Sequence, residues 1–116
     1  MPNTIDNIQQ FFDSVIFTRF NPDAADHDYS YRLNIGQSSY LLSIHDKLLT
    51  VNGPQYDGPA DVTITINEHD FLDIINGREG IQLLFMVGKI SIEGSLPVAL
   101  ALTRLFPLPK ERHAEV

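Results

Sequence analysis

Four histidines are the residues best suited to bind a metal or to transfer protons near neutral pH, and they are His27, His45, His69 and His113. No two of them lie four residues apart, the spacing that places two imidazoles on one helix face for zinc. Cysteine is absent, which excludes thiolate ligands, disulfides and thiol nucleophiles. We therefore expect surface roles for the histidines, and we predict no metal site and no cofactor.

Two short runs place acids and bases side by side. In the run 68–70 (Glu-His-Asp), neighbouring side chains of a helix point about 100° apart, and acids in a first turn are explained by the helix dipole. His45 and Asp46 follow Ser43 in a predicted tight turn, where adjacent residues cannot form a proton relay. The chain has no Gly-x-Ser-x-Gly motif and no phosphate-binding glycine loop. We predict no catalytic residues and no enzyme activity.

The charge balance limits the possible partners. The chain has 15 Asp and Glu against 8 Lys and Arg, a formal net charge of −7. Nucleic acids and anionic membranes attract clustered positive charge, so we expect no nucleic-acid binding. No apolar run approaches the roughly 18 residues of a membrane span, and the first residues lack the order of a signal peptide. We expect a soluble, cytoplasmic protein without stable membrane insertion.

The length of 116 residues suits one domain, 1–116, with a genuine hydrophobic core. Apolar residues recur at helical spacing from Ile5 to Ile16, and Thr4 is the predicted N-cap. Two prolines and mixed charge in residues 107–116 predict a flexible tail. The chain between these ends carries the sheet and further helices.

Alternation of apolar and polar residues predicts the strands. Residues 29–51 alternate with two short turns, which favours a three-stranded antiparallel meander. The loop 52–59 precedes a fourth strand at Val62–Ile66, and a fifth follows around residues 90–92. One face of the strands is polar. This pattern predicts an α+β domain in two layers, with a five-stranded mixed sheet and helices covering one face.

Two later helical segments carry more apolar surface than one sheet face covers. Asn67 is the predicted cap of an ordinary amphipathic helix. In contrast, Ile81 to Val87 is apolar in nearly every direction, and the predicted last helix, Ser95 to Phe106, is apolar over roughly 260° of its circumference. Another helix of the domain, a partner subunit or an apolar ligand must cover the remainder.

The order of motifs in residues 60–106 is distinctive. A strand is followed by an acidic cap before Phe71, by Asn-Gly-Arg at 76–78, by Phe-Met-Val-Gly-Lys and a strand ending at Gly94, and by an apolar helix. This order resembles the sterol carrier protein type 2 family, and the hairpin at 40–51 is also similar to the C-terminal domain of alkylsulfatases. The resemblance implies helices on one side of a five-stranded sheet and an apolar cavity for lipids.

The resemblance also implies a lining for that cavity, comprising Phe71, Leu72, Ile75, Leu83, Leu84, Phe85, Met86, Leu100, Leu102 and Phe106. The first hypothesis is non-catalytic binding of a sterol, fatty acyl or isoprenoid molecule, for transfer or presentation, by a small bacterial-type member. The alternative is an interaction or dimerisation module, an accessory factor in a lipid or quinone pathway with a homodimer or a partner enzyme. Thr103, Gln82 and Tyr56 are candidates for a head-group contact.

Overall fold

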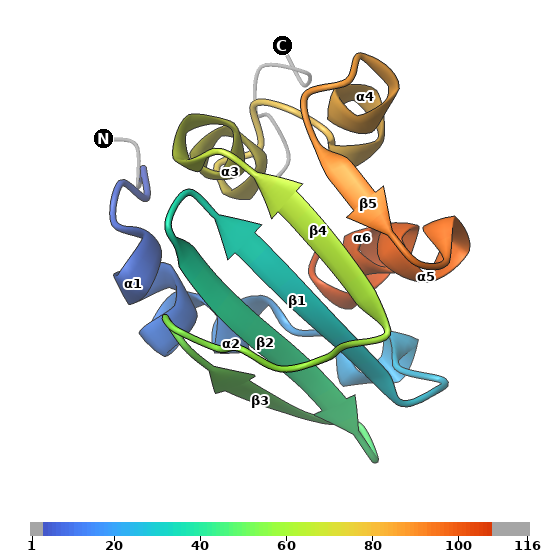
Figure 1. Ribbon diagram of the computed structural model, residues 1–116. Helices are drawn as coiled ribbons and strands as arrows, with labels where there is room; N and C mark the ends of the chain where they lie inside the picture. Colours follow the sequence, from blue (N-terminus) through green and yellow to red (C-terminus); the bar gives the residue numbers. More distant parts are fainter. Residues whose placement is uncertain (1–3, 108–116) are drawn as a thin grey trace, which may run out of the picture.

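The computed structural model describes residues 4–107. Five strands form one mixed sheet in the order β3-β2-β1-β4-β5 (Figure 1). The strands are β1 (Tyr29–Ile35), β2 (Ser38–His45), β3 (Leu48–Asn52), β4 (Val62–Ile66) and β5 (Ser91–Glu93). The pair β1 and β4 is parallel, and the other neighbouring pairs are antiparallel. The predicted α+β class with a mixed five-stranded sheet is confirmed.

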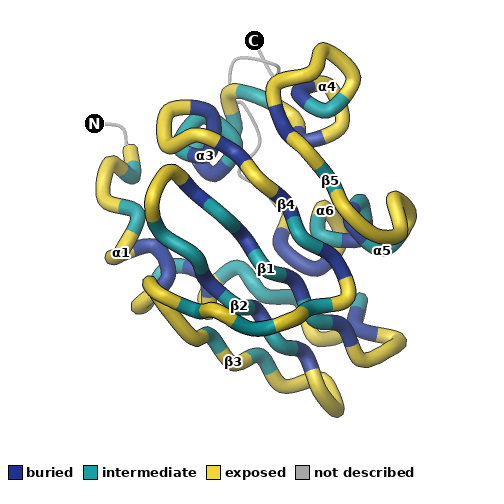
Figure 2. The backbone as a smooth tube through the Cα atoms, viewed as in Figure 1, coloured by how far each residue is buried: buried dark blue, intermediate teal, exposed yellow. Residues whose placement is uncertain are grey.

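Strict alternation along the central strands separates the two faces of the sheet. In β1 every second residue, from Tyr29 to Ile35, is buried, and the residues between them are half-buried (Figure 2). Leu33 lies opposite Tyr40 of β2 and beside Ile64 of β4. The helices pack on this apolar face. The loop 53–61 crosses the other face, where the Gly58 carbonyl accepts a hydrogen bond from Arg32.

The N-terminal helical segment is continuous and comprises α1 (Ile8–Gln10), a π-helical turn η1 (Phe11–Val15) and α2 (Ile16–Arg19). Its N-cap is Asn7, whose side chain accepts a hydrogen bond from the Gln10 amide. The prediction of Thr4 as the cap was therefore wrong. The reason is tertiary, because the backbone of Ile5 is hydrogen-bonded to the side chain of Asn76 and cannot form a helical turn. A short 3₁₀ turn, η2 (Pro22–Ala24), leads to β1.

Four short helices follow in the second half of the chain, and they are α3 (Glu68–Ile75), α4 (Ile81–Met86), α5 (Leu96–Leu100) and α6 (Leu102–Leu105). The predicted cap of α3 is confirmed, because Asn67 accepts a hydrogen bond from the Asp70 amide. The prediction of one last helix was wrong. The Ala101 amide is shared between the carbonyls of Pro97 and Val98 at 3.1 and 3.2 Å, which tightens the turn and divides the segment in two.

The helix α4 is not covered on all sides by the residues that the structure describes. Ile81 and Leu84 face inward, whereas Leu83, Met86 and Val87 are exposed. No helix within residues 4–107 has the length and apolar character needed to cross a membrane. The predicted tail, apart from Pro107, lies outside the described residues.

Candidate functional site

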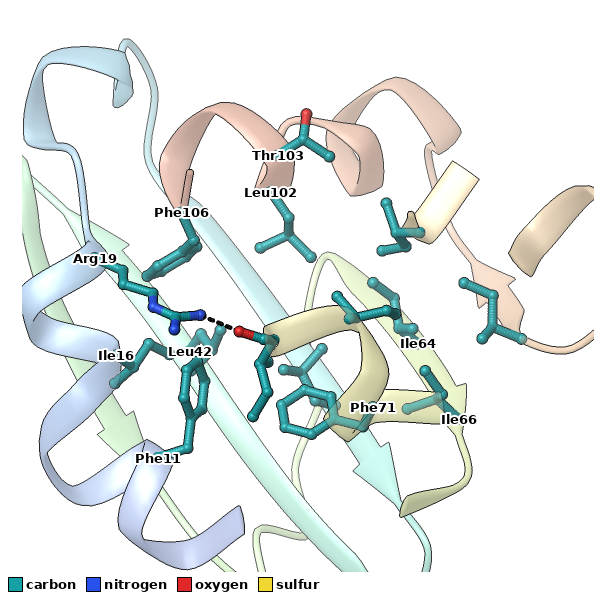
Figure 3. Close-up of a pocket in the computed structure, with 15 residues that line it drawn as sticks. Phe11, Ile16, Arg19, Leu42, Ile64, Ile66, Phe71, Leu102, Thr103 and Phe106 are labelled. Carbon is teal, nitrogen blue, oxygen red and sulfur yellow. Dashed lines mark hydrogen bonds between the residues drawn. The ribbon is translucent and has the colours of Figure 1, made fainter. Parts of the chain in front are cut away.

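An apolar cavity of about 100 Å³ lies between the helix-covered face of the sheet and the helices (Figure 3). The sheet supplies one wall from its three central strands, with Leu33, Leu42, Ile64 and Ile66. The remaining apolar lining residues are Phe11, Ile16, Phe71, Ile74, Ile75, Ile81, Ile90, Leu102 and Phe106. Arg19 and Thr103 complete the set of 15 lining residues, which is otherwise entirely apolar.

An aromatic cluster next to the cavity fixes the position of the N-terminal helical segment. The Phe12 ring stacks on Tyr40 with centroids 3.9 Å apart and lies parallel to Phe71 at 5.5 Å. Phe11 meets the edges of both phenylalanine rings. Aromatic pairs of this kind add about 0.5–1.5 kcal/mol each beyond simple burial. The cluster therefore holds Phe11, Ile16 and Arg19 against the space between α3 and the sheet.

The cavity offers water few partners. Within residues 4–107, no buried side-chain nitrogen or oxygen lacks a hydrogen-bond partner. Thr103, one of the two polar lining residues, donates its hydroxyl proton to the Leu100 carbonyl at 2.9 Å. A lining with so few hydrogen-bonding groups favours apolar molecules. The chemistry available here is the burial of hydrocarbon.

The structure places four of the ten residues predicted as lining at the cavity, and they are Phe71, Ile75, Leu102 and Phe106. Leu84 is buried elsewhere in the core, and Leu72, Phe85 and Leu100 pack against the core while partly exposed. Leu83 and Met86 are 54% and 71% exposed. Leu83 and Met86 are exposed because the short helix α4 packs against the core with one side only. Lipid contact by any of the ten residues stays a prediction.

Sequence reasoning missed the contribution of the sheet and of the N-terminal helical segment. Alternation predicted a polar and an apolar face for the strands, but it does not reveal where the apolar face is left open. Arg19 carried a detectable signal, because it follows Val15 by four residues and Ile16 by three. An arginine in line with an apolar helix stripe is unusual enough to mark a special contact.

Arg19 lies at the edge of the cavity and bridges two helices. Its guanidinium donates a hydrogen bond to the Ile75 carbonyl at the end of α3, and it sits 5.7 Å from the centroid of the Phe11 ring. Burial lowers the pKa of Arg19 from its ordinary value, yet a guanidinium remains charged in proteins. The cavity therefore has one permanent positive charge on an otherwise uncharged wall.

The other predicted head-group contacts lie apart from the cavity. Gln82 is exposed on α4. Tyr56 lies over Arg32 on the opposite face of the sheet, and its hydroxyl donates to the Pro59 carbonyl. Of the three candidates, only Thr103 lines the cavity.

A cluster of three side chains that could bind a metal ion lies at the start of α3. The potential ligand atoms of His69, Asp70 and Asp73 lie within 4.8 Å of one another. Spacing arguments centred on histidine pairs did not anticipate it. Asp73 is paired with Arg78 at 3.0 Å and with His69 at 3.4 Å, and Asp70 accepts a hydrogen bond from the Asn67 side chain. These contacts account for the cluster as part of the helix terminus.

Two of the remaining histidines, His27 and His45, do not line the cavity. His45 pairs with Asp28 at 2.8 Å, and both side chains are exposed. His27 packs its ring edge-on against Tyr29. His113 lies outside the described residues.

Comparison with known sequences identifies related proteins. The sequence model of the SCP-2 sterol transfer family matches residues 21–107. Over 52 residues the chain is 38% identical to human "Sterol carrier protein 2", and this match covers 45% of the chain and 10% of the relative. Over 45 residues it is 33% identical to a "Fatty acid-binding protein" of Yarrowia lipolytica, covering 39% of the chain and 35% of the relative. The matches thus span a minor part of each relative.

Comparison with solved structures shows the same fold in several proteins. The inverting sec-alkylsulfatase Pisa1 from Pseudomonas sp. superposes with a TM-score of 0.76 at 18% identity, over 90% of this chain and 17% of that one. Apo sterol carrier protein 2 from Yarrowia lipolytica superposes with a TM-score of 0.56 at 21% identity, and the match covers 66% of this chain and 65% of that one. A possible sterol carrier protein from Thermus thermophilus superposes with a TM-score of 0.66 at 10% identity, and the match covers 91% of this chain and 85% of that one. At these identities the likeness concerns the fold alone.

Proposed function

The chain belongs to the SCP-2 sterol transfer family, and from this premise we propose that it binds a lipid or another apolar small molecule between its sheet and helices. It carries or presents that molecule without catalysing a reaction. The observation that supports the proposal most directly is the cavity, in which 13 of the 15 lining residues are apolar. The similarity to a sterol carrier protein and to a fatty acid-binding protein agrees with this chemistry.

Burial of hydrocarbon supplies the driving force for such binding. Each Å² of apolar surface removed from water contributes about 25 cal/mol. The lining offers little directional chemistry, because its side chains are mostly isoleucine, leucine and phenylalanine. Affinity should therefore increase with the apolar area of the ligand.

The cavity must expand to accept a lipid. Its volume of about 100 Å³ is below the roughly 300–1,000 Å³ of typical ligand pockets. Among the surrounding helices, α4 is the best candidate to move, since Ile81 is its contribution to the lining while Leu83 and Met86 lie in solvent. Displacement of α4 would enlarge the space beneath it without exposing the aromatic cluster.

Leu102 provides a test of the cavity, because it is half-buried and points into the space from α6 (Figure 3). We expect Leu102→Trp to fill part of the volume and to weaken fatty-acid binding at least about tenfold, as measured by displacement of a neutral fluorescent probe. Leu49→Trp is a matched control, because Leu49 is a half-buried leucine that packs on the core from β3 without lining the cavity.

Two outcomes contradict the proposal. The first is the absence of any bound lipid in native mass spectrometry, together with no probe displacement at micromolar lipid. The second is an equal loss of affinity in both tryptophan variants, which points to general destabilisation rather than to a filled cavity.

The exposed side chains of α4 favour a second candidate, an interaction module. Leu83 and Met86 lie on α4, Val87 is its C-cap residue, and each of the three is more than half exposed. An apolar patch of this kind suits a partner protein or a second copy of the chain. Sedimentation across a range of concentrations tests the homodimer. A dimer that dissociates in Met86→Lys while lipid affinity is retained supports this candidate.

A further inference from the structure

The strand β3 forms one edge of the sheet, and within residues 4–107 no other strand pairs with its outer side (Figure 1). An unpaired edge presents amide and carbonyl groups to which another strand can bind, and proteins commonly protect such edges with charged residues, proline or a very short strand. The opposite edge is protected in this way, because β5 has three residues, ends at Glu93 and closely follows Lys89. In contrast, β3 has five residues, and its sequence Leu-Leu-Thr-Val-Asn contains neither a charge nor a proline.

The hairpin between β2 and β3 shows which backbone groups of β3 point away from the sheet. Asp46 and Lys47 form its two-residue turn, and both have positive φ, 55° and 65°, as in a type I′ turn. In such a hairpin the two residues that flank the turn, here His45 and Leu48, exchange backbone hydrogen bonds, and every second pair repeats this exchange. The amides and carbonyls of residues 48, 50 and 52 therefore point towards β2, and those of residues 49 and 51 point outwards.

From this geometry we propose that the outer edge of β3 binds the same edge of a second copy of the chain, with the two strands antiparallel and a two-fold axis at Thr50. In this register Leu49 lies opposite Val51 of the partner subunit, and Val51 lies opposite the partner's Leu49. Each of these opposing pairs exchanges both backbone hydrogen bonds, so the outward amides and carbonyls of both strands are all paired. The two five-stranded sheets become one continuous sheet.

The side chains of β3 also match in this register. Leu49 and Val51 are half-buried on the helix-covered face, next to Ile44 and Leu42 of β2. Contact between Leu49 of one copy and Val51 of the other removes further apolar surface from water. Thr50 is exposed on the polar face and meets its counterpart, a pairing of β-branched residues that favours strands. A shift by one residue would instead place a half-buried side chain opposite an exposed one.

Electrostatics favour a second copy at this edge. The chain has a net charge of −7, and its stretch 48–56 contains no charged residue. Two acidic molecules repel each other in most orientations, but in this register no like charges face each other along the two strands. Five residues from each copy form a small interface, so we expect a reversible dimer whose population increases with concentration.

Sedimentation velocity over a range of concentrations should show the wild-type protein passing from monomer to dimer. Thr50→Glu should weaken the dimer about fivefold or more, because two carboxylates then face each other across the axis. Thr65→Glu is the matched control. Thr65 is also an exposed threonine of the polar face with one long side-chain hydrogen bond, 3.4 Å in both cases, but it lies in the inner strand β4. This control changes the net charge equally and should leave the dimer at its wild-type strength.

Disulfide formation can locate the axis, because the chain has no cysteine of its own. Opposite residues of a non-hydrogen-bonded antiparallel pair have Cα atoms about 4.5 Å apart, within the range of about 4.4–6.8 Å that a disulfide spans. Thr50→Cys should therefore form a disulfide-linked dimer under mild oxidation. Leu48→Cys should not, although Leu48 is 69% exposed, because Asn52 of the partner subunit lies opposite it in this register.

The inference is overturned if the wild-type protein sediments as a monomer at every concentration. It is also overturned if Thr50→Glu and Thr65→Glu weaken the dimer equally, if Met86→Lys dissociates it, or if Leu48→Cys cross-links as readily as Thr50→Cys. The substituted side chains of β3 and β4 are exposed, so these variants should keep the circular dichroism spectrum of the wild type. The strand β3 contributes no residue to the cavity lining, so lipid binding and this dimer stand or fall separately.

Discussion

The side chain of Asn76 is hydrogen-bonded to the backbone of Ile5 through both of its polar atoms, with its oxygen accepting from the Ile5 amide and its nitrogen donating to the Ile5 carbonyl, each at 2.8 Å. The same nitrogen donates to the Leu72 carbonyl. One residue thus closes the end of α3 and attaches the N-terminal segment to it. Because the N-terminal helical segment supplies Phe11, Ile16 and Arg19 to the cavity, this attachment supports the candidate site.

Replacement of Asn76 by alanine should lower the free energy of unfolding by about 1–3 kcal/mol, because the partly buried backbone groups of Ile5 lose their partner. Urea denaturation measures this change. Asn52→Ala is a suitable control, because Asn52 is exposed at the end of β3. Equal stability of the two variants would show that the contact contributes nothing.

Gly80 and Gly88 at the two ends of α4 should respond oppositely to serine. Gly80 has φ −102° and ψ 144° at the N-cap position, and a β-carbon there meets no atom within 4 Å. Serine adds a capping hydroxyl and restricts the unfolded chain, so we expect a gain of about 0.5–1 kcal/mol. Gly88 has φ +83°, and Gly88→Ser should cost about 1–2 kcal/mol. Thermal unfolding of both variants tests the prediction, which fails if Gly80→Ser is as destabilising as Gly88→Ser.

Because the hydroxyl of Tyr31 is buried, we predict that the free energy of unfolding falls at alkaline pH. Its hydroxyl donates to the Val98 carbonyl at 2.7 Å, and burial raises the pKa of the phenol above its ordinary value of 10.0. The folded state holds this proton more tightly than the unfolded state. The resulting stabilisation is complete below about pH 10 and is lost as the pH rises beyond it.

The free energy of unfolding of the wild-type protein should therefore fall more steeply than that of Tyr31→Phe as the pH rises above about 10. At neutral pH the variant should be less stable by about 1 kcal/mol, because the Val98 carbonyl loses its donor. Urea titrations at several pH values measure both effects. Parallel pH profiles would contradict the assignment to Tyr31.

Local patterns were sufficient to predict the sheet. Alternation placed Tyr31 and Leu33 on the buried face, and the short turns required antiparallel neighbours. The helix cap at Asn67 was equally local, since its hydrogen bond spans three residues. Thr4 failed as a cap because a distant residue, Asn76, engages the backbone beside it. The predictions of the sheet and of the Asn67 cap thus held where the deciding contact was near in sequence, whereas the local turn at Ala101 was not predicted.

The candidate site was also predicted only in part from the sequence. The family resemblance, not helical spacing, implied lining residues from α3 and the last apolar segment, and Phe71 and Leu102 do line the cavity. The apolar composition of α4 does not indicate which side of this short helix meets the core. Leu83 and Met86 are exposed.

The sequence by itself determined the α+β class, the strands and the apolar character of the helices, because these depend on periodicities that neighbouring residues express. Only the tertiary structure decided where the apolar surfaces leave a cavity and which polar group reaches it. Its lining extends from Phe11 to Phe106, and Arg19 meets a carbonyl 56 positions away. Such contacts depend on how whole elements pack against one another, and no local pattern records that arrangement.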